Sequence, residues 1–293
     1  MPSFRLALPI VVALLVLAPA RSSAEPDPEA QKLFESIEWV VGPATGALGD
    51  KATIQVPAGM AFTGKDGTKK WMTLTHNLYD ESMLGVLVPQ ADSARWWAIF
   101  DYNNVGHVSD SEKDKLDADA ILKSLKEGND EANKELKKRG WRTVELVGWE
   151  KAPFYDTRTN NLTWSVRIRS ENGKEGVNHS VRLLGREGYM SADLILSPED
   201  MASAIPIYES LLGGFTYTEG HRYAEYRKGD KLAAYGLTAL IAGGAGAVAM
   251  KTGILAKFWK LIVVAVLGAF AALKRFFKTI LGWGRNEETI KPN

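Results

Sequence analysis

Three aromatic residues and two arginines in the second half of the chain are the best candidates for a binding site. Trp149, Tyr155 and Trp164 fall in neighbouring predicted strands, and Arg182 and Arg186 fall in a predicted hairpin that should lie beside them. Aromatic rings stack on sugars, and arginine side chains bind carboxylate or phosphate groups in bidentate fashion. The set therefore predicts a site for a glycan or an anionic group. In the alternative interpretation, the tryptophans are core residues and the arginines pair with acidic residues of the same domain.

Acidic residues give a second, catalytic hypothesis. Glu150, Asp156 and Asp101 are candidate acid/base pairs for a hydrolase, which needs two acids roughly 5–10 Å apart in a cleft, one of them with a raised pKa. Glu150 and Asp156, together with Glu187, are also the acids that the alternative interpretation pairs with the arginines. A catalytic role therefore depends on whether the fold brings two of these acids together.

The chain contains none of the short motifs that mark common catalytic sites. H-E-x-x-H, G-x-S-x-G and G-x-x-x-x-G-K-[ST] are absent, and the spacing of Gly42, Gly46 and Gly49 is wrong for a phosphate-binding loop. The four histidines are far apart without a partner at ligand spacing, and the sequence contains no cysteine. We therefore assign no catalytic residue and expect no metal site and no cofactor.

The N-terminal residues are typical of a signal peptide over residues 1–24. A basic start is followed by the unbroken apolar run Leu6–Leu17 and then by small residues. Two cleavage sites compete, after Ala20 and after Ala24, and the second is favoured because a proline lies within the recognised tripeptide of the first. Residues 25–231 are then expected to form a domain outside the cytoplasm.

The C-terminal part contains two apolar segments. Leu232–Met250 carries no charge, and at about 1.5 Å per residue a helix of this length crosses the roughly 30 Å hydrocarbon core of a bilayer. It is therefore predicted to be a transmembrane helix. Residues 251–284 contain a shorter apolar run, Leu261–Leu273, which either spans as the second arm of a helical hairpin or lies in the membrane interface. Residues 285–293 form a polar tail.

Charge is distributed unevenly between the domain and the C-terminal residues. The chain has a net charge of +1, but the residues after Met250 are strongly basic, so the preceding domain is acidic. An acidic domain argues against a nucleic-acid partner. The basic residues fit the cytoplasmic side of a membrane and its anionic lipid headgroups. Those expected to contact lipid are Lys257, Lys260, Lys274, Arg275 and Lys278.

Small residues in the predicted transmembrane helix mark a surface on which another helix can pack. Gly243, Gly246 and Ala247 belong to a run in which small residues recur four apart. Such spacing allows helices to approach closely, so self-association is one expectation. Packing against the chain's own second apolar segment is the alternative.

Apolar periodicity between the two ends predicts an α+β domain with an antiparallel sheet and packed helices. Gly128 is expected to divide the charged helical stretch at residues 110–138, and Gly140 is expected to end it. Further helices are predicted at Asp66–His76 and at residues 198–212. The predicted strands are Ala52–Val56, Leu84–Val88, Trp96–Tyr102, Thr143–Trp149, Leu162–Ile168, Val177–Leu184 and Tyr189–Leu196.

Five segments in order along the chain resemble a known family. They are Trp39–Lys51, Met83–Pro89, Val147–Asp156, Asn178–Tyr189 and Tyr223–Gly246. Together they are similar to the bacterial membrane-anchored proteins of domain of unknown function 2167. The resemblance implies a membrane anchor and a location in the cell envelope, and it transfers no catalytic residue. At the level of fold alone, the last strands and helix of the domain are similar to the PsbP and Mog1 type of α/β/α module.

These observations lead to one expected function and one alternative. The expected function is a non-catalytic binding or scaffold module, anchored in the bacterial inner membrane with its main domain in the periplasm. Its expected partners are the lipid bilayer and an envelope protein or wall component. The alternative is a hydrolase that acts on an envelope polymer through paired carboxylates.

Overall fold

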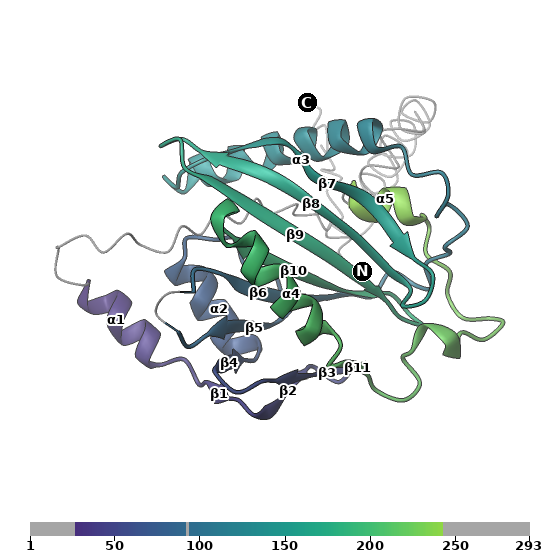
Figure 1. Cartoon of the computed structure of the whole chain (residues 1–293), viewed down its shortest axis with the longest axis horizontal. Helices are drawn as coiled ribbons and strands as arrows, with labels where there is room; N and C mark the ends of the chain where they lie inside the picture. Colours follow the sequence, from purple (N-terminus) through teal and green to yellow (C-terminus); the bar gives the residue numbers. More distant parts are fainter. Residues whose placement is uncertain (1–26, 92–93, 243–293) are drawn as a thin grey trace, which may run out of the picture. The chain divides into compact units, whose positions relative to one another are not determined.

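The computed structural model describes residues 27–91 and 94–242, which fold around a large antiparallel sheet (Figure 1). This sheet has eight strands in the order β1-β4-β5-β6-β10-β9-β8-β7. In that order the strands are β1 (Val40–Val41), β4 (Met60–Thr63), β5 (Met83–Pro89), β6 (Trp97–Asn103), β10 (Tyr189–Leu196), β9 (Glu175–Leu184), β8 (Asn161–Ser170) and β7 (Val144–Asp156). A smaller antiparallel sheet contains β11 (Phe215–Tyr217), β3 (Ala52–Val56) and β2 (Ala44–Leu48).

Helices cover both faces of the large sheet. They are α2 (Lys65–Leu74), α3 (Ala118–Lys138), α4 (Met201–Leu212) and α5 (Leu237–Ile241), while α1 (Pro28–Glu35) packs on α2. Short 3₁₀ turns lie at Pro198–Asp200 and Tyr223–Glu225. The predicted α+β class with an antiparallel sheet and packed helices is therefore confirmed for the described residues.

The alternation of residues along the central strands defines two faces. On β10, Met190, Ala192 and Leu194 point to the face covered by α4 and the small sheet, which we call the α4 face. The residues between them, Ser191 and Asp193, point to the opposite face, which we call the α3 face. Under α3 and α5 the α3 face carries one apolar cluster, and under α2 it carries another. Polar residues of the central strands lie between these two clusters.

Helix α3 is continuous, so the prediction that Gly128 divides it is wrong. The helix begins after Asp117, whose side chain accepts a hydrogen bond from the amide of Ala120 at 2.9 Å. It ends at Lys138, and Gly140, with φ of +69°, lets the amide of Trp141 bond to the carbonyl of Leu136 at 2.9 Å. Correct caps at both ends and a buried apolar side outweigh the cost of one internal glycine, about 1 kcal/mol.

The beginning of the predicted transmembrane helix belongs to the folded domain, which corrects the boundary placed at Lys231. Residues 232–236 are irregular, and α5 has only five residues. Leu237, Leu240 and Ile241 are at most 3% exposed and pack in the apolar cluster under α3. Within residues 27–91 and 94–242, no helix combines the length and apolar character needed to cross a membrane.

Several other predictions concern parts of the chain outside the described residues. These parts are the leader at residues 1–24 and everything from residue 243 onward. They include the small-residue run with Gly243, Gly246 and Ala247, and the five basic residues expected to contact lipid, Lys257, Lys260, Lys274, Arg275 and Lys278.

Candidate functional site

Three charged residues meet in the middle of the α3 face. Strand register places Arg182 of β9, Ser191 of β10 and Asp101 of β6 in one row across the sheet. Asp193 lies two residues beyond Ser191 and therefore on the same face. We call Asp101, Arg182 and Asp193 the charged cluster.

The guanidinium of Arg182 pairs with one acid of this cluster, Asp193. Its Nη1 donates a hydrogen bond to Oδ1 of Asp193 at 2.9 Å, and its Cζ lies 4.6 Å from the ring centre of the buried Trp164. Asn103 Nδ2 donates to Oδ1 of Asp101 at 2.6 Å. The Nε of Arg182 is buried and finds no partner among the described residues. The arginine is thus held by an ion pair and by contact with an aromatic face.

One of the two carboxylates retains a proton near neutral pH. Burial, followed by repulsion from the Asp193 carboxylate, raises the pKa of Asp101 to about 7. Arg182 and hydrogen bonds from Asn103 and Ser191 oppose this rise, but one guanidinium does not compensate for burial and a second carboxylate. The cluster therefore changes charge within the physiological pH range.

This arrangement predicts that Asp101→Asn changes how stability depends on pH. The folded-state pKa of Asp101 lies above its unfolded value, so the wild-type free energy of unfolding should fall as the pH rises from about 4 to about 7. Asparagine carries no charge and keeps an acceptor for Asn103. One pKa unit corresponds to about 1.4 kcal/mol. We therefore expect the free energy of unfolding of the variant, relative to that of the wild type, to increase by about 2–4 kcal/mol between pH 4 and pH 8.

Urea denaturation of the full-length chain across this pH range measures the effect. Asp66→Asn, at an exposed position of α2, is the matched control and should follow the wild-type profile. Parallel pH profiles for Asp101→Asn and wild type would show that folding does not change the pKa of Asp101.

The five residues predicted to form a binding surface do not lie together as one surface. Arg182 contacts Trp164, as described, and Trp164 is only 3% exposed. Trp149 donates from Nε1 to the carbonyl of Ala118 at 3.2 Å. The hydroxyl of Tyr155 donates to the side chain of Asn160 at 3.3 Å. The structure thus brings Trp164 and Arg182 together and gives Trp149 and Tyr155 partners within the domain.

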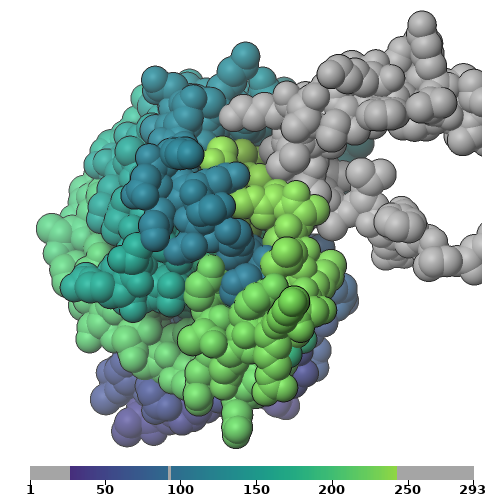
Figure 2. All heavy atoms as spheres, turned by 90° about the vertical axis from the view of Figure 1, so that its right-hand side faces the viewer, coloured from purple at the N-terminus to yellow at the C-terminus, as the bar shows by residue number. Residues whose placement is uncertain are grey.

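Arg186 serves to hold the segment that leads to α5. Its Nε and Nη2 each donate to the carboxylate of Asp230 at 2.7 Å, and this pairing lowers the pKa of Asp230 to about 2. Two backbone hydrogen bonds of 2.8 Å join His107 to Lys231 and Ala233. Figure 2 shows this green segment on the surface beside the blue residues that precede α3. Arg186 is therefore occupied within its own chain.

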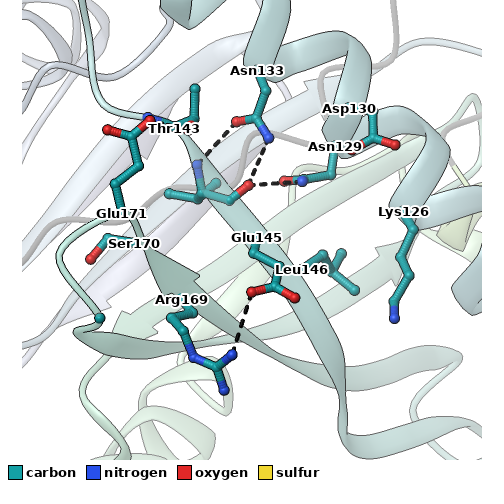
Figure 3. A pocket seen from close by; sticks show the side chains of 12 residues that line it. Lys126, Asn129, Asp130, Asn133, Thr143, Glu145, Leu146, Arg169, Ser170 and Glu171 are labelled. Carbon is teal, nitrogen blue, oxygen red and sulfur yellow. Dashed lines mark hydrogen bonds and ion pairs between the residues drawn. The ribbon is translucent and has the colours of Figure 1, made fainter.

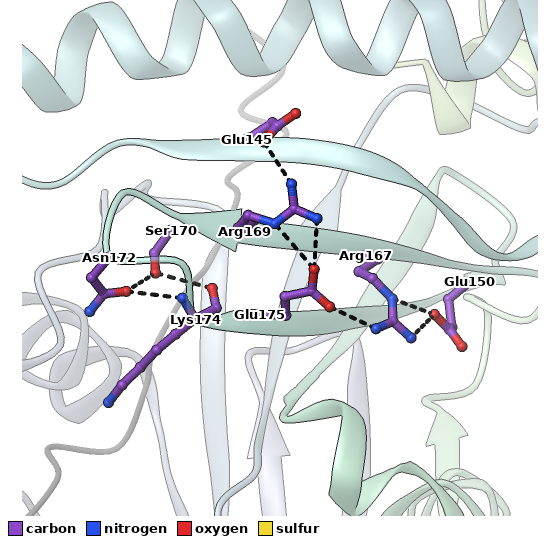
Figure 4. Close-up of polar contacts among 8 residues, drawn as sticks. All are labelled: Glu145, Glu150, Arg167, Arg169, Ser170, Asn172, Lys174 and Glu175. Atoms are coloured by element: carbon purple, nitrogen blue, oxygen red, sulfur yellow. Dashed lines mark hydrogen bonds and ion pairs between the residues drawn. The ribbon is translucent and has the colours of Figure 1, made fainter.

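Two of the three predicted catalytic acids are also engaged in ion pairs. Glu150 accepts from Nε and Nη2 of Arg167 at 2.9 and 2.6 Å, and Arg167 also donates to Glu175 at 2.8 Å (Figure 4). Asp156 pairs with the exposed Arg158 at 3.0 Å. Asp101 is therefore the predicted acid that the fold places beside a second carboxylate, and that carboxylate, Asp193, was not predicted. Its signal in the sequence is a single acid within an otherwise apolar strand.

A separate pocket of about 530 Å³ lies between α3 and the paired strands β7 and β8 (Figure 3). Asn133 closes one side, because its side chain donates to the carbonyl of Val144 at 2.7 Å and accepts from the Val144 amide at 3.0 Å. Asn129 donates to the same carbonyl at 2.9 Å. These contacts occupy backbone groups on the outer edge of β7, where a sheet otherwise offers unpaired donors and acceptors.

The lining of this pocket is polar and carries both signs of charge. It consists of Lys126, Asn129, Asp130, Asn133, Thr143, Val144, Glu145, Leu146, Arg169, Ser170, Glu171 and Gly173. Asn129 is only 3% exposed, and its Oδ1 has no hydrogen-bond partner among the described residues. A buried acceptor without a donor favours binding of a ligand or water that supplies one. Neither carboxylate of the charged cluster lines the pocket.

Fold and site together define an α+β domain with a half-buried charged cluster and a separate polar pocket. Residues 41–274 match the family described as "Protein of unknown function (DUF2167)". The chain belongs to this family, which confirms the resemblance found in the five sequence segments. No curated protein matches the chain.

Two solved structures show a distant likeness. The solution structure of cyanobacterial PsbP (CyanoP) from Synechocystis sp. PCC 6803 has 12% identity and a TM-score of 0.33, and the match covers 62% of this chain and 93% of that one. The crystal structure of the Ran-binding protein Mog1p from Saccharomyces cerevisiae has 11% identity and a TM-score of 0.32, covering 66% and 99%. TM-scores this low do not indicate a shared function.

Proposed function

We propose that the domain is a non-catalytic binding module of the bacterial cell envelope and that the pocket between α3 and β7 is its ligand site. One observation carries this proposal: the pocket is lined by Asn129, whose buried Oδ1 lacks a hydrogen-bond donor. A catalytic site needs its perturbed acid or base at the place where substrate binds. Here the raised pKa belongs to Asp101, which does not line the pocket. The separation of the two features supports binding without catalysis.

The envelope location is supported by the sequence at both ends of the chain. The leader at residues 1–24 predicts export, and the apolar segments Leu232–Met250 and Leu261–Leu273 predict an anchor in the inner membrane. The basic residues around the run Leu261–Leu273 favour contact with anionic lipid on the cytoplasmic side. The domain is thus proposed to face the periplasm, where an envelope protein or wall component is its partner.

Filling the pocket with a large side chain tests whether it is the ligand site. Glu145→Trp places a large ring at the pocket from an exposed position of β7, and Lys151→Trp places the same ring on that strand outside the pocket. Saturation-transfer NMR with a library of small polar molecules should detect ligands of the full-length chain. Glu145→Trp should abolish their binding and Lys151→Trp should preserve it. Ligands that bind both variants equally, or a library without ligands, would contradict the assignment of the site.

Location is tested by fusing alkaline phosphatase after Ala242. The enzyme is active only outside the cytoplasm, so activity supports export of the domain, and an inactive fusion contradicts it. Retention of the full-length chain in carbonate-washed membranes, with release of the chain that ends at Ala242, supports an anchor after Ala242.

A second candidate function is hydrolysis at the charged cluster. The raised pKa of Asp101 favours it, because a carboxyl group that is protonated near pH 7 is suited to general acid catalysis. Hydrolysis of purified envelope polymers by the wild-type chain, lost in a folded Asp101→Asn variant, would support this function over the first. Equal release of products by both proteins, or no release by either, would exclude a catalytic role for Asp101 on these polymers.

A further inference from the structure

The helix side of the pocket presents two charges and one unpaired acceptor in a fixed order. Lys126, Asn129 and Asp130 are spaced as i, i+3 and i+4, so they share one side of α3, and all three line the pocket. The side chains of Lys126 and Asp130 are exposed, and neither has an ion-pair partner among the described residues. Four residues of helix separate them by about 6 Å along the axis.

Charges on the strand side of the pocket are largely neutralised by neighbours. Arg169 donates to Glu175 at 2.8 and 3.2 Å and contacts Glu145 at 3.4 Å (Figures 3 and 4). Glu171 accepts hydrogen bonds from the hydroxyl and the amide of Thr143, and these bonds lower its pKa. The ammonium of Lys126 and the carboxylate of Asp130 are therefore the charges that remain for a ligand.

A ligand that complements this set must itself carry both charges. A carboxylate is the natural partner of Lys126, and an ammonium group is the natural partner of Asp130. A neutral sugar would leave both charges without counterparts, and a simple anion would be repelled by Asp130.

We propose that the pocket binds a small zwitterion, namely a free amino acid or a short peptide with both termini uncapped. This proposal rests on the proposed binding function and names the ligand class of that site. Lys126 contacts the carboxylate, and Asp130 contacts the ammonium group. The volume of about 530 Å³ lies in the range of pockets that bind small molecules.

Calorimetric titration of the purified full-length chain with four probes tests the ligand class. The probes are alanylalanine, N-acetyl-alanylalanine, alanylalanine amide and a neutral disaccharide. Only the first carries both charges, so it should bind at least about tenfold more tightly than each of the others, since a hydrogen bond to a charged group contributes roughly this factor.

Variants of Lys126 and Asp130 test which residue contacts which end of the peptide. Lys126→Met should lower the affinity for alanylalanine about tenfold and leave the amide probe unaffected, because that probe has no carboxylate to lose. Asp130→Asn should lower the affinity for alanylalanine similarly and leave the N-acetyl probe unaffected. Lys123→Met and Glu127→Gln are matched controls, because these residues have the same spacing on α3, are exposed and do not line the pocket.

The outcomes separate this proposal from the binding function on which it rests. Preferential binding of alanylalanine, with losses confined to the Lys126 and Asp130 variants, supports the zwitterion. Preferential binding of the disaccharide, blocked by Glu145→Trp, would overturn the zwitterion and keep the binding function. Equal losses in the control variants would overturn the assigned contacts. If neither these probes nor the polar library bind, the binding function itself is overturned.

Discussion

Ending the chain after Lys231 is expected to unfold the domain, whereas ending it after Ala242 is expected to leave it folded. The shorter chain loses α5, whose Leu237, Leu240 and Ile241 are at most 3% exposed in the cluster under α3. Burial of each such side chain contributes about 1.5–3 kcal/mol, so the loss amounts to about 5 kcal/mol or more. Many domains have a total stability of only about 5–15 kcal/mol.

Urea denaturation of the two chains, both starting at Glu25, measures this difference. Leu240→Ala in the longer chain removes one buried side chain of α5 and should lower the free energy of unfolding by about 2–5 kcal/mol. Leu232→Ala is the matched control, because Leu232 is 59% exposed and its truncation should have little effect. Equal midpoints for the chains ending at Lys231 and Ala242 would show that α5 does not stabilise the domain.

This boundary shows what apolar composition does and does not predict. Leu232–Met250 has the length and composition of a membrane span, yet its first part is irregular and then forms the short buried helix α5. A buried helix and a membrane helix both lack charges, so hydropathy does not distinguish them over a short stretch. A contact distant in sequence accompanies the buried helix, because the side chain of Glu112, 126 residues earlier in the chain, accepts a hydrogen bond from the Thr238 amide at 3.0 Å.

The sheet was largely predictable because its strands alternate or form apolar runs over their full length. The four strands from β7 to β10 were predicted in sequence and pair as neighbours. Strand β2 was missed because it contains Gly46, a residue type that is depleted in strands. Strands β1, β4 and β11 were missed, since two to four residues are too few to establish a period of two. Their pairing depends on partners far away in the sequence.

The candidate sites were predictable only in part. Arg182 and Trp164 were selected for their chemistry and do meet, because both lie on the α3 face of adjacent strands. The sequence offered no means of pairing Asp101 with Asp193, which are brought together only by the order of β6 and β10. The pocket depends on Asn129 and Asn133 reaching Val144, a contact between a helix and an edge strand. Such contacts follow from tertiary packing and leave no periodic signal.

Replacing Arg182 with methionine is expected to destabilise the domain by about 3–5 kcal/mol at pH 7.5. Methionine is unbranched and apolar, so it keeps most of the packing on Trp164 while removing the charge. The carboxylates of Asp101 and Asp193 then remain on the α3 face without their cation. Breaking a buried ion pair by removing one partner is costly for this reason. Arg158→Met is the matched control, because Arg158 is 87% exposed and its pair with Asp156 should contribute nothing measurable.

The pH dependence of this loss distinguishes electrostatics from packing. Without Arg182, which lowers it in the wild type, the pKa of Asp101 should rise further above its unfolded value, so acid should stabilise the variant relative to its state at pH 7.5. The deficit measured by thermal and urea denaturation should therefore shrink at pH 5. Adding Asp193→Asn should also recover part of it, because one of the two uncompensated charges is removed. A deficit that is the same at both pH values and in the double variant would mean that Arg182 acts through its contact with Trp164, and that its charge is not what the cluster requires.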